Sequence, residues 1–261
     1  MNVALRSSDR AAGSIEPAVI SISGLSKSFG PAKQVFSGIS FDIAPGSLVA
    51  LIGANGAGKS TLLRCIPRLI EPDSGSIHVL GTDVLGSRRN LRGLRSHLGF
   101  VFQKHNLVGR LSALTNVVHG AQARRYGPRA WLQSLAPNAV REEAMACLER
   151  VGLPQTAAQR ADSLSGGQSQ RVAIARALMQ QPDIVLADEP AASLDPQAGD
   201  EVMELFAGLM RREAKTVVFT SHNLTHALAF SDRVIALGGG RIQLDAPASA
   251  LRESDLRGLY V

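Results

Sequence analysis

The chain has 261 residues, of which 45% are hydrophobic and 19% are charged, with 25 Gly and 12 Pro. This is the composition of a globular protein with room for one large α/β domain or two small ones. The net charge of +6 fits nucleic acid, an anionic membrane surface or a phosphate-bearing ligand, and charge alone does not choose among them.

Several kinds of segment are not expected. No apolar run approaches the roughly eighteen residues that a membrane-spanning helix needs. Residues 1–17 lack the apolar core of a secretory signal and predict a disordered tail. Cys65 and Cys147 lie in helical patterns without CxxC spacing. They predict apolar filler in a reducing compartment, and neither a disulfide nor a metal site.

Short apolar runs rich in β-branched residues predict strands over residues 19–22, 48–52, 98–102, 184–187, 216–220 and 234–237. Most of these runs are continuous, as in strands buried on both faces of a largely parallel sheet, and helical patterns between several of them indicate an α/β core.

Three further intervals differ from this alternation. Helical patterns without a convincing strand predict a helical insertion over about residues 105–180. Gly and Pro punctuate residues 71–83 and 238–247, which predicts peripheral hairpins there.

The strand LVALI runs directly into GANGAGKST, and a helical pattern follows. This is a phosphate-binding loop in the strand-to-helix context that gives the motif its meaning. A Gly-rich turn that merely contains a lysine is the weaker interpretation. Glycines let the backbone wrap a phosphate chain, Lys59 places a cation on the β- and γ-phosphates, and the Ser60 hydroxyl can ligate Mg²⁺. The candidate nucleotide-binding residues are Gly53, Ala54, Asn55, Gly56, Ala57, Gly58, Lys59, Ser60 and Thr61.

A second apolar strand, in DIVLADEP, ends in two carboxylates. A carboxylate buried at a strand end is unfavourable unless a cation meets it, so Asp188 is a candidate ligand of Mg²⁺ together with Ser60. Glu189 is predicted to point the other way and to orient the attacking water as a base, before Pro190 ends the strand. Two carboxylates at a strand end would, by themselves, indicate the start of a solvated loop. Because the chain also has a phosphate loop, the catalytic interpretation of this pair is favoured.

Three single residues follow the same reasoning. Gln103 comes directly after LGFVF and His222 directly after TVVFTS, which places both at the carboxyl edge of the sheet, where ligands of α/β folds bind. Either one could equally be an ordinary polar residue. Phe29 could stack on an adenine ring, and core packing explains it equally well.

The stretch LSGGQ, residues 164–168, raises a different question. A serine and two glycines stand at the start of a helix, where free backbone N–H groups attract an anion, yet no lysine follows. A serine-capped helix start would explain Ser165 but not the paired glycines. The chain thus has two candidate anion-binding segments and one phosphate-binding lysine.

The set GANGAGKST, Gln103, LSGGQ, DIVLADEP, SLDP and His222, in this order and spacing, resembles the ATP-binding subunit of an ABC transporter, over roughly residues 18–245. The resemblance implies one ATP-binding domain over residues 18–261. Its fold would be a P-loop NTPase α/β core with a mostly parallel sheet, a peripheral antiparallel β-subdomain and an inserted α-helical subdomain.

The resemblance also implies an answer to the question of LSGGQ. Family members pack two copies head to tail, so that each ATP is clamped between the phosphate loop of one copy and LSGGQ of the other. The residues implied to meet the γ-phosphate in trans are Ser165, Gly166, Gly167 and Gln168. Asp195 matches the loop that family members place across the dimer seam.

Further roles carry over from the family. Gln103 is implied to bind Mg²⁺ and to link it and the attacking water to the helical insertion. His222 is implied to contact the γ-phosphate and to support Glu189, and Phe29 stands where the family usually has an aromatic residue, most often Tyr.

A finer resemblance is to phosphonate-import ATPases. It rests on GFVFQKHNLVGRLSALTNVVHG, on EPAASLDP and on the stretch over residues 121–140, whereas Ala191 stands where those proteins usually have a larger apolar residue. It implies an ATPase subunit on the cytoplasmic face of the inner membrane. Its partners would be membrane-spanning permease subunits and, indirectly, a periplasmic solute-binding protein.

Rival interpretations remain open. The chain could serve an ABC importer or exporter of another solute. A nucleic-acid-associated ATPase is suggested by Arg88, Arg89, Arg92 and Arg95, but the long coiled-coil insertion or tandem domains usual in such proteins are missing, so no nucleic-acid partner is expected. Intact Glu189 and His222 argue against a non-hydrolysing nucleotide sensor.

Overall fold

The computed structural model describes residues 17–30, 33–124 and 134–258. The predicted tail lies outside these residues apart from Pro17, as does much of the stretch over residues 121–140. The strands are β1 (Ile20–Ser28), β2 (Gln34–Ile43), β3 (Leu48–Ile52), β4 (Ser74–Val79), β5 (Thr82–Asp83), β6 (Leu98–Val101), β7 (Ile184–Ala187), β8 (Thr216–Thr220), β9 (Arg233–Gly238) and β10 (Arg241–Pro247). The helices are α1 (Lys59–Cys65), α2 (Arg88–Ser96), α3 (Ala113–Val118), α4 (Asn138–Arg150), α5 (Gly166–Met179), α6 (Pro196–Arg212), α7 (Leu224–Phe230) and α8 (Glu253–Arg257).

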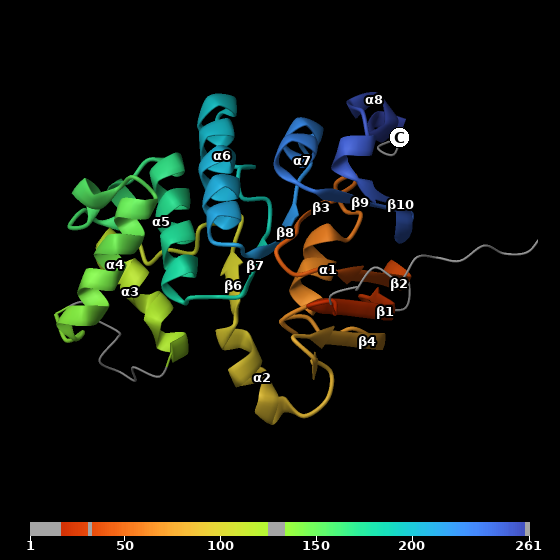
Figure 1. Cartoon of the computed structure of the whole chain (residues 1–261), viewed down its shortest axis with the longest axis horizontal. Coiled ribbons are helices and arrows are strands. Elements are labelled where there is room, and N and C mark those ends of the chain that lie inside the picture. Colours follow the sequence, from red (N-terminus) through yellow and green to blue (C-terminus); the bar gives the residue numbers. More distant parts are fainter. Residues whose placement is uncertain (1–16, 31–32, 125–133, 259–261) are drawn as a thin grey trace, which may run out of the picture.

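The strands form two sheets (Figure 1). The larger one has the order β10-β9-β3-β8-β7-β6 and is parallel except for β10, which pairs antiparallel with β9. The smaller one has the order β2-β1-β4-β5 and is antiparallel throughout. The predicted fold class, a P-loop α/β core with a peripheral antiparallel sheet, is confirmed. Both predicted hairpins are present as β4–β5 and β9–β10.

The sequence reasoning missed β2 and did not assign β1 to a sheet of its own. In β2 buried and exposed residues alternate, and in β1 the register with its partners shifts several times, so neither strand gives the continuous apolar run that marks β3 or β8. Alternation of buried and exposed residues is typical of antiparallel strands in a sheet with one solvent-exposed face.

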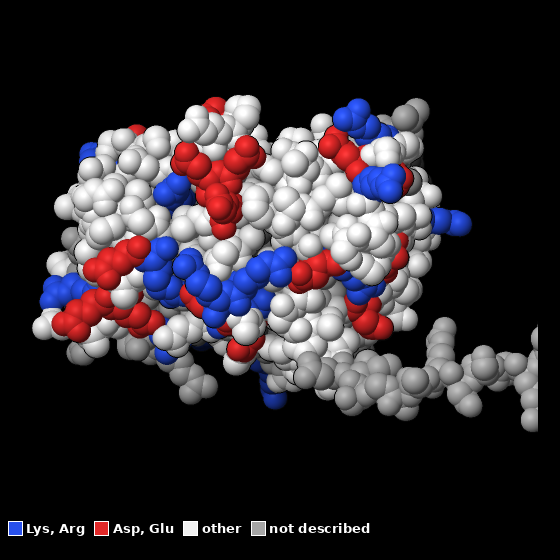
Figure 2. Space-filling model, turned by 45° about the horizontal axis from the view of Figure 1, so that its top comes forward, with Lys and Arg blue, Asp and Glu red and all other residues white. Residues whose placement is uncertain are grey.

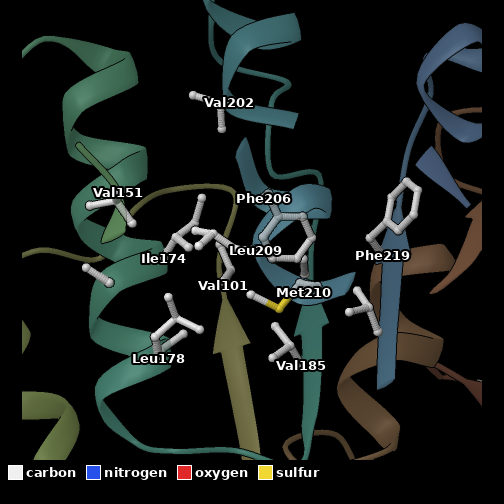
Figure 3. Close-up of a cluster of buried hydrophobic side chains, with 14 of the residues drawn as sticks. Val101, Val151, Ile174, Leu178, Val185, Val202, Phe206, Leu209, Met210 and Phe219 are labelled. Carbon is white, nitrogen blue, oxygen red and sulfur yellow. The ribbon is translucent and has the colours of Figure 1, made fainter. Parts of the chain in front are cut away.

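Two hydrophobic clusters hold the layers together. In the first, α5 and α6 pack on the face of β6, β7 and β8, with Phe206, Met210 and Phe219 among the side chains drawn in Figure 3. In the second, Leu62 and Leu63 of α1 are buried between the two sheets. Burial of large apolar side chains contributes about 1.5–3 kcal/mol each, so α1 and the loop that precedes it are fixed by the packing of both sheets.

The thiols belong to the same clusters. Cys65 at the end of α1 and Cys147 on α4 are both buried among apolar side chains, as predicted, and both are free thiols. Burial raises the pKa of Cys65 to about 12 and raises that of Cys147 as well.

The parallel register brings the ends of four strands to one edge. Leu51 of β3 is opposite Thr220 of β8, and Ala187 of β7 is opposite Phe219 of β8 and Val101 of β6. The loops that follow these strands are therefore neighbours.

The chain between β6 and β7 leaves the sheet and forms α3, α4 and α5, which pack on one another at the side of the larger sheet (Figure 1). Within the described part of this interval the only β pairing is an isolated bridge between Ser112 and Arg160. Across the described ranges, no helix has both the length and the apolar content that crossing a bilayer demands.

Candidate active site

The phosphate loop connects β3 to α1, and its glycines are required by the fold. Gly53 has φ +145°, and a Cβ there would lie 2.2 Å from the carbonyl oxygen of Leu237. Gly58 has φ +96° and stands at the N-terminus of α1, where a Cβ would lie 2.8 Å from Cγ1 of Val35. No side chain caps α1, so the loop leaves backbone N–H groups for an anion.

Lys59 is held across this loop. Its ammonium donates hydrogen bonds to the carbonyl oxygens of Gly53 (2.8 Å) and Ala54 (3.2 Å), and only 4% of the residue is exposed. Burial lowers the pKa of Lys59, and the nearby charges of Glu189 and Asp188 partly oppose that effect. A bound polyphosphate would act in the same direction as these carboxylates and favour the charged amine.

Asp188 is fully buried and accepts three hydrogen bonds. The donors are the hydroxyl of Ser60 (2.7 Å), the hydroxyl of Thr220 (3.0 Å) and Nη2 of Arg64 (2.8 Å). A buried carboxylate is stable only when it is paired and hydrogen-bonded, and this one is both before any metal binds.

The sequence reasoning missed Arg64 and Thr220. One signal could have found Arg64, because it follows Ser60 by four residues on α1 and so lies on the same face of the helix. Thr220 is the last residue of β8, which pairs with β7, and strand order alone could have placed it beside Asp188.

The Glu189 side chain has different neighbours from the adjacent Asp188, but the alternation of side chains along a strand is not the reason. Its strand ends at Ala187 rather than at Pro190, and Glu189 has φ +47°, so strand alternation does not set its direction. The backbone N–H of Glu189 donates to the hydroxyl of Thr220 (2.8 Å) and anchors this turn. A left-handed conformation at a non-glycine residue costs about 1–3 kcal/mol and is typical of functional sites.

The three predicted catalytic residues meet at this carboxylate. Oε2 of Glu189 lies 3.4 Å from Nε2 of Gln103 and 3.4 Å from Nδ1 of His222. The Glu189 side chain is 14% exposed. Carboxylate, amide and imidazole therefore form one cluster, and its Glu189 also lines the cavity at the phosphate loop. The roles of the three residues in catalysis stay predictions.

A cavity of about 220 Å³ lies between the loop, Glu189 and the segment that contains Phe29. Phe29 is 50% exposed, and Nζ of Lys27 lies 5.4 Å from its ring centroid. Core packing therefore does not explain this aromatic residue. The exposed ring borders the phosphate-loop cavity, and its stacking on a base stays a prediction.

The stretch LSGGQ, residues 164–168, which we call the signature segment, contains the start of α5. Ser165 caps the helix by accepting from the N–H of Gln168, and the side chain of Gln168 accepts from the N–H of Ser165. A Cβ on Gly166 would lie 3.0 Å from Cδ2 of Leu194, whereas one on Gly167 would find its nearest atom, on Ala198, at 3.8 Å. The fold of this chain therefore leaves room for a side chain at residue 167.

A second cavity, of about 500 Å³, opens at this helix start and is also lined by Asp195. The Asp195 carboxylate caps α6 by accepting from the N–H of Ala198 (3.0 Å). This cavity and the phosphate-loop cavity have no lining residue in common among the described ranges. The structure does not bring the signature segment to the phosphate loop of the same copy.

The rim of the second cavity carries both signs of charge. Arg171 of α5 lies 3.2 Å from Glu201 of α6. Figure 2 shows a group of acidic side chains next to a band of basic ones on this side of the molecule. Such mixed charge suits contact with another protein surface more than contact with a uniformly anionic polymer.

Comparison with known proteins agrees with this geometry. The family model described as ABC transporter matches residues 36–192, which is more than half of the chain. The chain belongs to the ABC transporter family.

Individual relatives of this ABC cassette are similar along almost their whole length. The chain is 49% identical over 251 residues to the "Phosphonates import ATP-binding protein PhnC" of Stutzerimonas stutzeri, covering 93% of this chain and 90% of the relative. It is 48% identical over 227 residues to the "Phosphate-import ATP-binding protein PhnC" of Mycolicibacterium smegmatis, covering 85% and 84%.

Among solved structures, the cassette resembles MJ0796, a bacterial ABC transporter cassette. That protein was solved as a dimer in a post-hydrolysis state with ADP and Pi. The TM-score is 0.77 at 31% identity, and the match covers 88% of this chain and 98% of the other. The chain is thus a nucleotide-binding ATPase cassette.

The donor set of this cassette also fits a metal. The Ser60 hydroxyl, the Asp188 carboxylate and the Gln103 amide offer oxygen ligands, which Mg²⁺ prefers. No group of three or more His, Cys, Asp and Glu able to hold a metal exists in the described part of the chain.

Proposed function

We propose that this chain is the ATP-hydrolysing subunit of an importer for phosphonates or related phosphorus oxyanions. The observation that carries the proposal is the 49% identity, over 93% of the chain, to a protein named as a phosphonate importer's ATP-binding protein. The three-residue cluster at Glu189 supports hydrolysis rather than nucleotide sensing. The ATP-binding domain would span residues 18–261.

In the proposed reaction, the phosphate loop binds the triphosphate and Lys59 lies on the β- and γ-phosphates. Asp188, Ser60 and Gln103 would hold Mg²⁺, which supplies charge neutralisation at the phosphates. Glu189 orients and deprotonates the attacking water, and His222 contacts the γ-phosphate and steadies the carboxylate. Little covalent chemistry is left for the protein, so catalysis comes from positioning and charge stabilisation.

A second copy of the chain would complete each site. Its signature segment, Ser165 to Gln168, would meet the γ-phosphate held by Lys59 of the first copy, with Asp195 at the seam. The separate cavities and the unfilled space at Gly167 support this arrangement, and so does the dimer in which the related MJ0796 cassette was solved. Because a two-fold axis uses the same surfaces on both copies, each copy needs both half-sites.

The remaining partners follow from the importer role. Membrane-spanning permease subunits would receive the movement of α3, α4 and α5, and a periplasmic solute-binding protein would deliver the solute. The cassette would then lie peripherally on the cytoplasmic face of the inner membrane. Nucleic acid is not an expected partner. Of the arginines on α2, Arg95 donates to the carbonyl oxygens of Pro67 and Arg68, and Arg88 lies 3.6 Å from Glu71.

Inorganic phosphate is a second candidate solute, because the relative from Mycolicibacterium smegmatis carries that name. The test is uptake by cells in which the gene for this chain is deleted and then restored as the wild type or as Lys59→Ala. Growth on a phosphonate as sole phosphorus source should require the wild type. Restored uptake of radiolabelled phosphate without growth on the phosphonate would favour the second candidate, and growth of the deleted strain on both would contradict the importer role.

A further inference from the structure

Helix α5 also contacts the segment that follows Gln103, through a residue in its second half. Arg176, ten residues after Gly166 on this helix, donates from Nη1 to the carbonyl oxygen of Asn106 (2.6 Å) and from Nη2 to that of His105 (2.8 Å). His105 and Asn106 lie two and three residues after Gln103 along the chain. One guanidinium therefore donates hydrogen bonds to two consecutive peptide carbonyls just after Gln103.

This use of a charge is unusual. Arg176 is half-buried, and no carboxylate in the described ranges lies within ion-pairing distance of it. Burial lowers the pKa of the Arg176 guanidinium and that of the His105 imidazole beside it. Removing a charge from water without an acidic partner is unfavourable, and two carbonyl oxygens offset the loss only when the geometry is good. The planar fork of arginine provides that geometry, and the single ammonium of lysine does not.

The segment bound by Arg176 lacks regular secondary structure, so other contacts must fix its conformation. Residues 104–108 have no helix or strand, and Asn106 has φ +50°. Farther along, the buried side chain of Asn116 on α3 accepts from the N–H of Val108 and donates to its carbonyl oxygen. A strained backbone keeps its conformation only where its surroundings impose it, and here the side chains that do so come from α5 and α3.

We propose that Arg176 is a positioning residue that sets Gln103 opposite Glu189 and ties it to the signature helix. The inference rests on the proposed function, since it assigns Arg176 a part in ATP hydrolysis. Rotation of α5 toward a partner copy would carry residues 105–106 with it, and the 3.4 Å approach of Gln103 to Glu189 would change accordingly. Contact of the signature segment with a partner copy and placement of the Gln103 amide would then occur in one movement.

The test compares ATP hydrolysis by the full-length chain carrying Arg176→Gln, Arg176→Lys, Gln103→Ala or the double change Gln103→Ala with Arg176→Gln. Arg176→Gln should lower kcat about 10- to 100-fold, because misplacement of a catalytic group by about 1 Å has that effect. The KM for ATP should stay within about twofold, since Arg176 does not line the phosphate-loop cavity. The double variant should be no slower than Gln103→Ala alone, because both changes remove the same contribution.

Arg150→Lys is the matched control. Arg150 is another half-buried arginine of the helical region, and its side chain contacts Glu213 and Cys147 rather than residues 103–106. Its kcat should remain within about twofold of the wild type. Thermal unfolding of every variant separates loss of activity from loss of fold. If Arg176→Gln does not fold, Arg176→Lys decides, since it keeps the charge and loses the fork.

Two results would overturn the proposal. One is multiplication of the Gln103→Ala and Arg176→Gln effects in the double variant, as expected of independent sites. The other is full activity of Arg176→Lys. Wild-type protein without ATPase activity would instead count against the proposed function itself, so the two failures are distinguishable.

Discussion

The phosphate loop and the signature segment are both glycine-rich turns at helix starts, but they differ in what makes glycine necessary. In the phosphate loop, a Cβ on Gly53 would collide with the carbonyl oxygen of Leu237 in the same chain. In the signature segment, a Cβ on Gly167 would find space. The fold requires the first glycine, whereas no close contact in the described part of this copy requires the second.

The two regions also differ in how complete they are. The phosphate loop has its lysine, its buried carboxylate Asp188 and the cluster around Glu189 within one chain. The signature segment has a capped helix start and an open cavity of about 500 Å³. The first region should therefore bind nucleotide by itself, whereas the second should matter only when two copies meet.

The largest expected effect separates binding from hydrolysis. Glu189→Gln should lower ATP turnover about 10²- to 10⁴-fold, because it removes the general base and leaves the loop intact. ATP should still bind, and the variant should remain dimeric with ATP. Turnover assays and sedimentation with ATP measure both properties. Glu204→Gln, on the exposed side of α6, is the control. Rapid turnover by Glu189→Gln would refute the base assignment.

The next effect tests the phosphate loop alone. Lys59→Ala should weaken ATP binding about 10- to 150-fold, since a hydrogen bond to a charged group contributes roughly 1.5–3 kcal/mol. Titration of a fluorescent ATP analogue into the dilute protein gives the affinity. Lys215→Ala, directly before β8 and away from the loop, should bind like the wild type. Unchanged affinity in Lys59→Ala would mean that the triphosphate lies elsewhere.

A smaller effect tests the signature segment alone. Gly167→Ala should leave folding and ATP binding by the single copy unchanged, because the added methyl has room. ATP-dependent dimerisation, measured in a Glu189→Gln background, should weaken about 5- to 150-fold, as overpacking of a close contact costs about 1–3 kcal/mol. Gly208→Ala, where nothing lies within 4 Å of the new Cβ, is the matched helix control. Undiminished dimerisation would place the second copy on another surface.

The smallest effect concerns local opening of the two regions. Cys65 lies behind the phosphate loop and Cys147 lies among the helices that follow β6. In single-cysteine variants, ATP should slow alkylation of Cys65 a few-fold and change that of Cys147 less. Even at pH 9, native Cys65 should react far more slowly than a free thiol, because burial raises its pKa to about 12 and leaves only a small fraction as thiolate. Fast alkylation of native Cys65 would show that the loop is not fixed by its packing.

Much of this could be predicted because the decisive signals are local. The phosphate loop, the strand before Asp188 and the start of α5 are each encoded in about ten consecutive residues, and the resemblance to a family assigned them roles. The parallel strands were found from continuous apolar runs. The antiparallel strand β2 was not found, because its alternating pattern resembles that of a loop with scattered apolar residues.

The rest depends on contacts between distant segments. Arg64 reaches Asp188 across 124 positions of sequence, and Arg176 reaches His105 across 71. No sequence pattern around any of these four residues predicts the two contacts. The left-handed conformation of Glu189 is likewise imposed by a hydrogen bond to Thr220 on a neighbouring strand, which strand periodicity could not reveal.

The separation of the two cavities has a genetic consequence. If each working site borrows half of its parts from each copy, a chain defective in Lys59 and a chain defective in Gly167 can rescue one another when they are expressed together. A mixed pair then contains one site with both defects and one with neither. The intact site would restore part of the transport that either defective chain lacks by itself.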